Sequence, residues 1–138
     1  MPRIKLPFMP GESPIIQVEI SYPGGKMGTG ATTKSILVPL VVDTGARWSF
    51  IAKDVIDSLA LPNKGKAQVI TGNGGVLFDT YQSDLRFPTI NLLFPDTIVR
   101  ELRTWNAPRF LGLLGMDILS KGTFHMDGPG GEFTLTFP

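Results

Sequence analysis

The chain has few side chains that can do covalent or proton-transfer chemistry, and most of them are carboxylates. Its 138 residues include no cysteine and a single histidine, His125. A thiolate nucleophile, a thiolate metal cage and a multi-histidine metal site within one chain are therefore excluded. The twelve Asp and Glu residues remain as candidates for general acid and base catalysis. We accordingly expect no metal and no cofactor.

One aspartate is distinguished by its surroundings. Asp43 directly follows the apolar run Leu40–Val42 and is followed by Thr44, Gly45 and Ala46. A buried strand would deliver this carboxylate to the edge of the core, and a glycine two residues later permits close backbone approach. An Asx-type turn that only closes a strand fits the same residues, and on this tetrapeptide alone it is the better-supported interpretation.

The other polar and aromatic candidates have the spacing of structural residues. Four further aspartates are spaced as on the solvated faces of a helix and a hairpin, without the pattern of a calcium loop. The histidine lies in an alternating polar strand, and the two tryptophans are expected to anchor the core. The residues given these roles are Asp54, Asp57, Asp79, Asp84, His125, Trp48 and Trp105.

Hydrophobic periodicity predicts a mainly β framework around Asp43. With 16 Gly and 12 Pro, tight turns and short strands are favoured over long helices. Pro39, inside a predicted strand, needs a bulge or an unpaired N–H position. Asn73-Gly74 is a hairpin-turn signal, because both residues tolerate positive φ. Expected strands are 16–20, 35–42, a hairpin over 66–87, 90–94, 110–114, 123–127 and 132–137; expected helices are 52–59 and 116–121; residues 96–105 fit either strand or helix.

Charge and hydropathy give no sign of a nucleic acid or membrane partner. The net charge is +1 without a block of like charge, so nucleic-acid binding is not expected. The longest apolar stretch, within Ile36–Val42, is far too short to span a bilayer. Because Met1–Pro7 lacks the features of a signal peptide, we expect a cytoplasmic location.

Two motifs taken together resemble the retroviral-type (retropepsin-like) aspartic proteases, especially their retrotransposon and bacterial branches. Asp43–Ile51 matches the pattern D-[ST]-G-A-x-x-S-F-I that opens the site in this family, and Leu114–Leu119 matches the closing L-G-M-D-x-L. The resemblance covers most of the chain and departs in 96–110 and before Gly11. It implies a closed β-barrel-type acid protease fold with one or two short helices and a flap hairpin.

The resemblance also implies a function, an aspartic endopeptidase that needs two copies of the chain. A single Asp-Thr-Gly makes half of a two-carboxylate site, so residues 1–138 are expected to form one domain of a homodimer, with strands 2–6 and 133–137 interleaved between subunits. Asp43 would serve as general base and acid, Thr44 would brace the loops, and Gly45 would present carbonyls to an extended peptide. Expected substrate contacts are Ala46, Arg47, Ile70, Thr71, Gly72, Asn73, Gly74, Leu111 and Leu113.

Several points stay open at this stage. A catalytically silent, retropepsin-like dimerisation or peptide-binding module is the main alternative, and a carboxylate-pair glycosidase would need a second buried acid. Arg47 could pair with Asp117 or lie free at the surface. Because the expected pocket walls formed by Leu111, Leu113, Ala46 and Ile70 are uncharged, apolar residues are expected beside the scissile bond. A mildly acidic pH optimum is expected, since one carboxyl of the pair must stay protonated.

Overall fold

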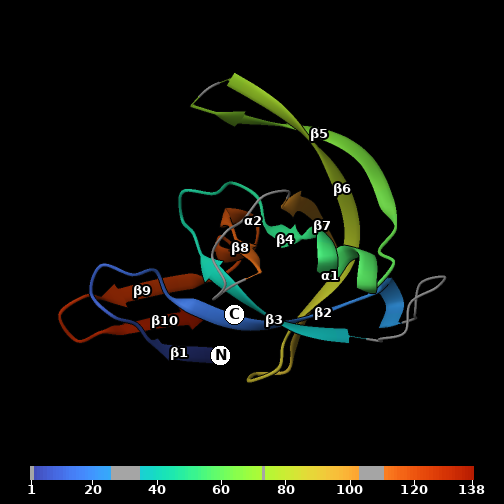
Figure 1. Cartoon of the computed structure of the whole chain (residues 1–138). Coiled ribbons are helices and arrows are strands. Elements are labelled where there is room, and N and C mark those ends of the chain that lie inside the picture. The colour runs from blue at the N-terminus through green and yellow to red at the C-terminus, as the bar shows by residue number, and fades with distance from the viewer. Residues whose placement is uncertain (1, 26–34, 73, 103–110) are drawn as a thin grey trace.

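Strands dominate the computed structural model, which describes residues 2–25, 35–72, 74–102 and 111–138 (Figure 1). The predicted mainly β class is confirmed. The elements are β1 (Arg3–Pro7), β2 (Ile15–Ser21), the 3-10 turn η1 (Pro23–Gly25), β3 (Ser35–Val42), β4 (Phe50–Ala52), α1 (Lys53–Ser58), β5 (Asn63–Thr71), β6 (Gly74–Phe87), β7 (Leu92–Leu102), β8 (Gly112–Leu114), α2 (Met116–Leu119), β9 (Thr123–Asp127) and β10 (Glu132–Thr136).

Six of these strands close into a barrel, as the resemblance implied. The larger sheet has the order β2-β3-β8-β4-β7-β6-β5. Strand β2 also pairs with β6, where Ile20 lies opposite Leu85, and this pairing closes the ring. Strand β5 is left outside the ring, as the outer arm of a hairpin with β6. The barrel therefore forms the body of the molecule, and the hairpin extends from it.

The barrel interior is filled by the alternating apolar residues that the strand patterns predicted. On β2, the buried residues are Ile16, Val18 and Ile20. On the neighbouring strand β3, Leu40 and Val38 lie beside Ile16 and Val18 and are also buried. Full burial of one such side chain stabilises the fold by about 1.5–3 kcal/mol. The helix predicted after β4 is present as α1, and its buried residues Val55 and Ile56 belong to the same core.

Pro39 fits inside β3 because its missing N–H faces a gap in the sheet. The pairing with β2 runs without a register shift past Gln17 opposite Pro39. The carbonyl of Pro39 accepts the N–H of Leu111, on the side of β8. A residue's N–H and C=O point to the same side of a strand, so the missing donor lies where β8 has not yet begun. The predicted unpaired position is therefore confirmed.

A second, three-stranded sheet joins the two ends of the chain. Its order is β1-β10-β9, and Phe133 and Leu135 of β10 are fully buried beneath it. Both edges of β10 are thus filled within one chain. The expected interleaving of strands 2–6 and 133–137 between subunits stays a prediction; within the described residues of one chain, the outer edges of β1 and β9 are the edges of this sheet. His125 lies exposed on β9, as predicted.

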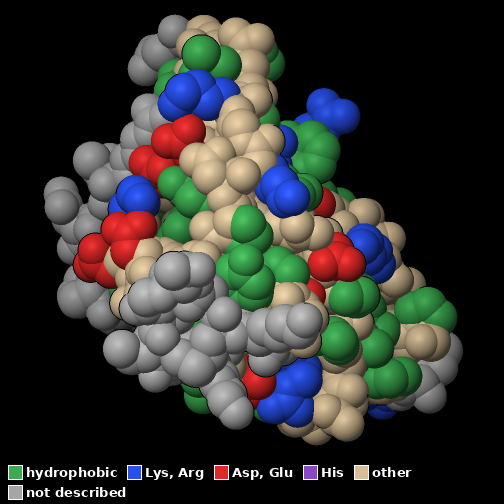
Figure 2. Space-filling view, turned by 90° about the vertical axis from the view of Figure 1, so that its right-hand side faces the viewer, with side chains coloured by type: hydrophobic (Ala, Val, Ile, Leu, Met, Phe, Trp, Pro, Cys, Tyr) green, Lys and Arg blue, Asp and Glu red, His purple; other side chains and the backbone are tan. Residues whose placement is uncertain are grey.

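The β5–β6 hairpin curves over the barrel and stands out from the surface (Figures 1 and 2). The outermost pair of its two arms is Thr71 opposite Gly74. Gly74 has φ of +101°, which only glycine adopts without strain. Asn73 lies outside the described residues. On the face drawn in Figure 2, basic and acidic side chains are interspersed rather than gathered by sign.

Asp84 is buried, and the prediction of a solvated face for it was wrong. The β6–β7 register shifts between Ser83 and Leu85, so that three successive residues are buried instead of alternating. The carboxylate of Asp84 accepts a hydrogen bond from the N–H of Gly24 at 3.1 Å and another from the N–H of Asp96 at 2.9 Å. The buried charge is thus held by backbone donors, as burial of a carboxylate requires.

Several element boundaries also differ from the predictions, among them the ends of β7 and α2. The ambiguous segment after Asp96 continues as strand β7 to Leu102, and the remainder up to Trp105 lies outside the described residues. Helix α2 ends at Leu119, two residues earlier than expected.

Candidate active site

The loop of residues 43–49, here called the Asp43 loop, begins where β3 ends. The N–H of Asp43 donates to the carbonyl of Leu114 at 3.0 Å, which ties the loop to β8. Oδ1 of Asp43 accepts the N–H of Gly45 at 2.9 Å, and the N–H of Ala46 donates to the Asp43 carbonyl at 3.2 Å. This is an Asx turn, and it holds a half-buried carboxylate in one orientation. A Cβ at Gly45 would lie 3.2 Å from Oδ1.

The Asp43 loop also receives the first N–H groups of α2. The N–H of Met116 donates to the Ala46 carbonyl at 2.8 Å, and that of Asp117 donates to the Arg47 carbonyl at 3.1 Å. These are donors that a helix cannot satisfy internally. Gly115 makes this approach possible, because a Cβ there would lie 2.4 Å from the Trp48 carbonyl oxygen. The two sequence motifs are therefore joined through their backbones.

Ser49 and Asp117 form a buried clamp between the same two motifs. Ser49 has 0% exposure, and its Oγ donates to Asp117 Oδ1 at 2.7 Å while accepting the N–H of Gly115 at 3.0 Å. Its own N–H donates to Asp117 Oδ2 at 3.1 Å. Of the two alternatives left open for Arg47, the surface position is observed: Arg47 is exposed, and the Asp117 carboxylate is bound by Ser49 instead. The role of Ser49 was missed, although its place in the opening motif was the available signal.

Arg100 is a second residue that sequence reasoning missed. It lies on β7 opposite Phe50 and is only 6% exposed. Its guanidinium carbon is 4.1 Å from the ring centroid of Trp48, and that of Arg47 is 5.3 Å from the same ring. Burial lowers the pKa of Arg100, the charge of Asp117 opposes this, and the charge of Arg47 adds to the lowering. Trp48 is thus half-buried with two guanidinium groups over its ring, so it is not a plain core anchor.

The structure brings part of the predicted substrate-contact set together. Thr44, Gly45 and Arg47 are exposed on the Asp43 loop, and Ala46 is half-buried there. Leu113 is half-buried and faces the same side of the sheet as Phe50. Leu111 is exposed just before β8 and is not in the strand that was expected to hold it. On the hairpin Ile70, Gly72 and Gly74 are exposed, Thr71 is placed by its pairing with Gly74, and Asn73 lies outside the described residues.

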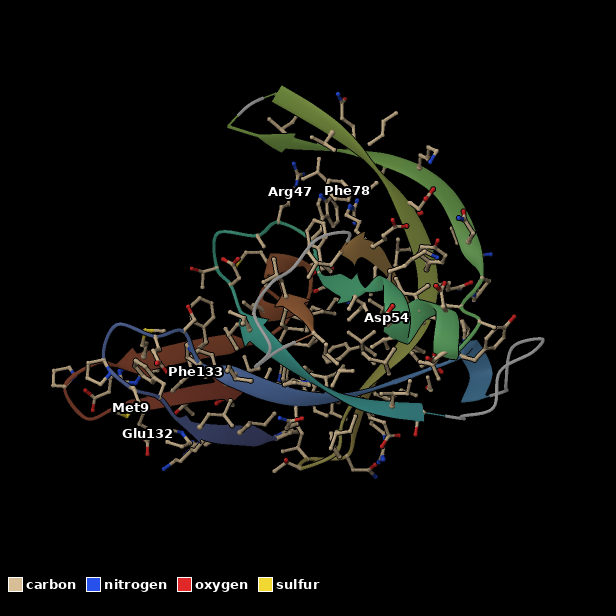
Figure 3. All side chains as sticks on the ribbon, in the orientation of Figure 1. Met9, Arg47, Asp54, Phe78, Glu132 and Phe133 are labelled. Atoms are coloured by element: carbon tan, nitrogen blue, oxygen red, sulfur yellow. The ribbon has the colours of Figure 1, made fainter. Side chains whose placement is uncertain are left out.

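The hairpin lies over the Asp43 loop. The ring of Phe78 on β6 packs edge-on against Phe50 of β4, with 5.3 Å between the centroids. Figure 3 places the labelled side chains of Arg47 and Phe78 in the space between the loop and the hairpin. Residues expected to bind one ligand therefore come from the loop below and the hairpin above.

Two features that would indicate other chemistry or location are not found in the described ranges. Among those residues, no group of three or more His, Cys, Asp or Glu side chains is placed to hold a metal ion. In the same part of the chain, no helix has both the length and the apolar character needed to cross a membrane.

Comparison with known proteins identifies the fold by structure, not by sequence. No protein-family model matches the chain, and no curated protein sequence matches it. A retropepsin-like aspartic protease from Rickettsia conorii superposes with a TM-score of 0.62 at 15% identity, covering 98% of this chain and 90% of that one. EIAV protease in complex with the inhibitor HBY-793 superposes with a TM-score of 0.52 at 18% identity. The match covers 80% of this chain and 88% of that one. The chain therefore has the retropepsin-like fold of aspartic proteases.

Proposed function

We propose that the chain is an aspartic endopeptidase that works as a homodimer. The observation that supports this most directly is the Asp43 carboxylate: it lies half-exposed at the end of a barrel strand and is oriented by the N–H of Gly45. The residues around it are Thr44 and Gly45, in a retropepsin-like fold. A carboxylate held in one orientation is the arrangement that proton transfer requires.

The proposed reaction uses two carboxyl groups and one water. One Asp43, as carboxylate, takes a proton from the water while its oxygen attacks the peptide carbonyl carbon. The symmetry-related Asp43, protonated, donates to the carbonyl oxygen, and a tetrahedral diol forms. The C–N bond then breaks as the first carboxyl gives its proton to the nitrogen, while the second Asp43, now a carboxylate, takes a proton from one hydroxyl of the diol, which releases the acid and the amine and restores the starting pair. Two carboxylates about 3 Å apart share one proton, so each step finds one acid and one base.

One chain supplies one Asp43, so the proposed site needs a second copy. Thr44 is exposed beside it, which leaves it free to contact the partner loop across a two-fold axis. Because β10 is flanked on both sides, we propose that the partner joins at the outer edges of β1 or β9 and at the Asp43 loops. Residues 1–138 would then form one domain and half of the active site.

The substrate would bind as an extended strand between the Asp43 loop and the β5–β6 hairpin. Exposed Ile70 and Gly72 on the hairpin would cover it from above. Leu113 and Ala46 would line the pockets beside the scissile bond, where apolar side chains are preferred. The hairpin would act as the lid that excludes water during the reaction.

A peptide-library digest across pH tests the proposal with wild type and Asp43→Asn. We expect the wild type to cleave with a mildly acidic optimum, and the variant to lose about 100-fold or more of its rate because the carboxylate carries the proton transfers. Asp54→Asn, an exposed aspartate on α1, is the matched control and should cleave normally. Equal cleavage by wild type and Asp43→Asn, or cleavage by neither, contradicts the proposal.

One observation favours a second candidate, a peptide-binding module without turnover. The bond from the Gly45 N–H to Asp43 Oδ1 closes an Asx turn, so the carboxylate also has a purely structural use. Under this alternative, labelled library peptides bind to the wild type and to Asp43→Asn equally, and neither protein cleaves them.

A further inference from the structure

Two arginines lie over the ring of Trp48, and among the described residues no carboxylate forms an ion pair with either of them. In the described ranges the ion pairs are Lys53–Asp57, Lys66–Asp79 and Arg86–Glu19, and neither Arg47 nor Arg100 takes part. The acidic group whose charge raises the pKa of Arg100 is Asp117, and both oxygens of Asp117 accept hydrogen bonds from Ser49. The Arg47–Trp48–Arg100 cluster is therefore cationic as it stands.

The inner member of the cluster is costly to bury in this state. Arg100 is 6% exposed, and within the described part of the chain its Nε and Nη1 are buried without a hydrogen-bond acceptor. A buried donor without an acceptor destabilises the fold, and an uncompensated buried charge does so more strongly. A buried cation also acts on a nearby anion more strongly than a solvated one, because the local dielectric constant is lower. The site is thus built for a negative charge that this chain does not supply from its described residues.

The outer member of the cluster faces the place proposed for the substrate. Arg47 is exposed and directly follows Ala46 on the Asp43 loop. The side chains of Arg47 and Phe78 both lie beneath the hairpin (Figure 3). Arg100 faces the same side of the sheet as Phe50, which contacts Phe78. Both arginines therefore lie on the side of the barrel over which the hairpin extends.

We propose that Arg47, Trp48 and Arg100 form a subsite that binds the carboxylate of an Asp or Glu side chain in the peptide substrate. This proposal rests on the proposed function and specifies the class of peptide that is cleaved. Such a peptide has apolar residues beside the scissile bond and, farther along the chain, an acidic residue whose side chain reaches Arg47. Arg47 donates to the substrate carboxylate with its guanidinium. Arg100 is a positioning residue, which packs on the Trp48 ring and adds its charge.

Binding of matched peptides tests the subsite without requiring turnover. The probes are fluorescein-labelled peptides with two central phenylalanines and a single Glu at each other position in turn, each paired with its Gln analogue. Anisotropy with the Asp43→Asn protein should show one position where Glu binds about tenfold or more tighter than Gln, as for a charge-assisted hydrogen bond. The preference should weaken as salt is raised.

Variants in the Asp43→Asn background assign the preference to the cluster. Arg47→Gln should abolish the preference, measured as the ratio of Glu-peptide to Gln-peptide affinity, and Arg47→Glu should shift it to a Lys peptide. Arg100→Met should reduce the same ratio severalfold. Lys64→Gln, an exposed lysine at the start of β5, removes the same charge and should leave the preference intact.

The outcomes separate this proposal from the proposed function. Equal binding of Glu and Gln peptides at every position, binding of no peptide at all, or a Glu preference that survives Arg47→Gln would overturn the subsite. Failure of the wild type to cleave any peptide overturns the endopeptidase, while a Glu preference lost in Arg47→Gln still establishes the subsite.

Discussion

The Asp43 loop and the β5–β6 hairpin above it are held in opposite ways. The loop is joined to β8 and α2 by backbone hydrogen bonds and by the fully buried Ser49. The hairpin is exposed along most of its outer half, with Ile70 at 77% exposure. A Cβ at Gly115 beneath the loop would overlap backbone atoms, whereas one at Gly72 in the hairpin would meet nothing within 4 Å. The contrast matches what the proposed chemistry needs, a fixed carboxylate beneath a cover that can open.

Gly115→Ala should give the largest effect, because it forces the loop and α2 apart. The new Cβ would lie 2.4 Å from the Trp48 carbonyl oxygen and 2.8 Å from that of Ala46, and neither backbone can move independently. We expect a loss of about 4 kcal/mol or more in the free energy of unfolding. Urea unfolding followed by tryptophan fluorescence measures it.

Gly72→Ala is the matched control in the hairpin, and we expect a change within about 0.5 kcal/mol. Comparable losses in the two alanine variants would mean that the loop and the hairpin are equally constrained, which would break the comparison.

Ser49→Ala should give the next largest effect. It removes the hydroxyl that bridges Asp117 and the N–H of Gly115, leaving a buried donor without an acceptor. The expected cost is about 1–3 kcal/mol in unfolding free energy, seen as a lower urea midpoint with an unchanged slope. Ser120→Ala, at an exposed serine after α2, should be nearly neutral. A neutral Ser49→Ala would show that the backbone bonds alone hold the loop.

Lys66→Gln should have the smallest effect, because it acts on the exposed hairpin. Lys66 Nζ lies 2.9 Å from Asp79 Oδ1 across the two arms, with side-chain exposures of 58% and 26%. Exposed pairs of this kind contribute under about 1 kcal/mol and weaken with salt. Thermal unfolding at low and high salt measures the difference. A salt-independent loss of several kcal/mol would indicate that the hairpin is as firmly held as the loop.

The fold could be predicted from local patterns wherever these were regular. The alternation of apolar and polar residues predicted β2, and a run of β-branched residues predicted β3. The turn residues around Gly74 predicted the hairpin. The burial of Asp84 could not be predicted, because a bulge buries three successive residues and no local sequence pattern indicates the bulge. The end of β7 was ambiguous because it carries two buried charged residues, Arg100 and Glu101.

The candidate site was predicted where one short motif contains the relevant residues. Asp43 and Gly45 are two positions apart, so their contact follows from the motif itself. The Ser49–Asp117 clamp joins residues 68 positions apart, and the contact of Arg100 with Trp48 depends on the parallel pairing of β4 with β7. Such contacts depend on the strand order, which the sequence pattern does not specify.

A mixing experiment tests most directly whether one active site uses Asp43 from two chains. Wild-type and Asp43→Asn chains are combined at constant total concentration, allowed to exchange, and assayed for peptide cleavage. If the site needs two intact aspartates, an equal mixture should retain about a quarter of the wild-type rate, because a quarter of randomly formed dimers are wholly wild type. A mixture with Asp54→Asn chains should keep the full rate. Retention of half the rate in the Asp43→Asn mixture would mean that each chain acts alone and would contradict the account.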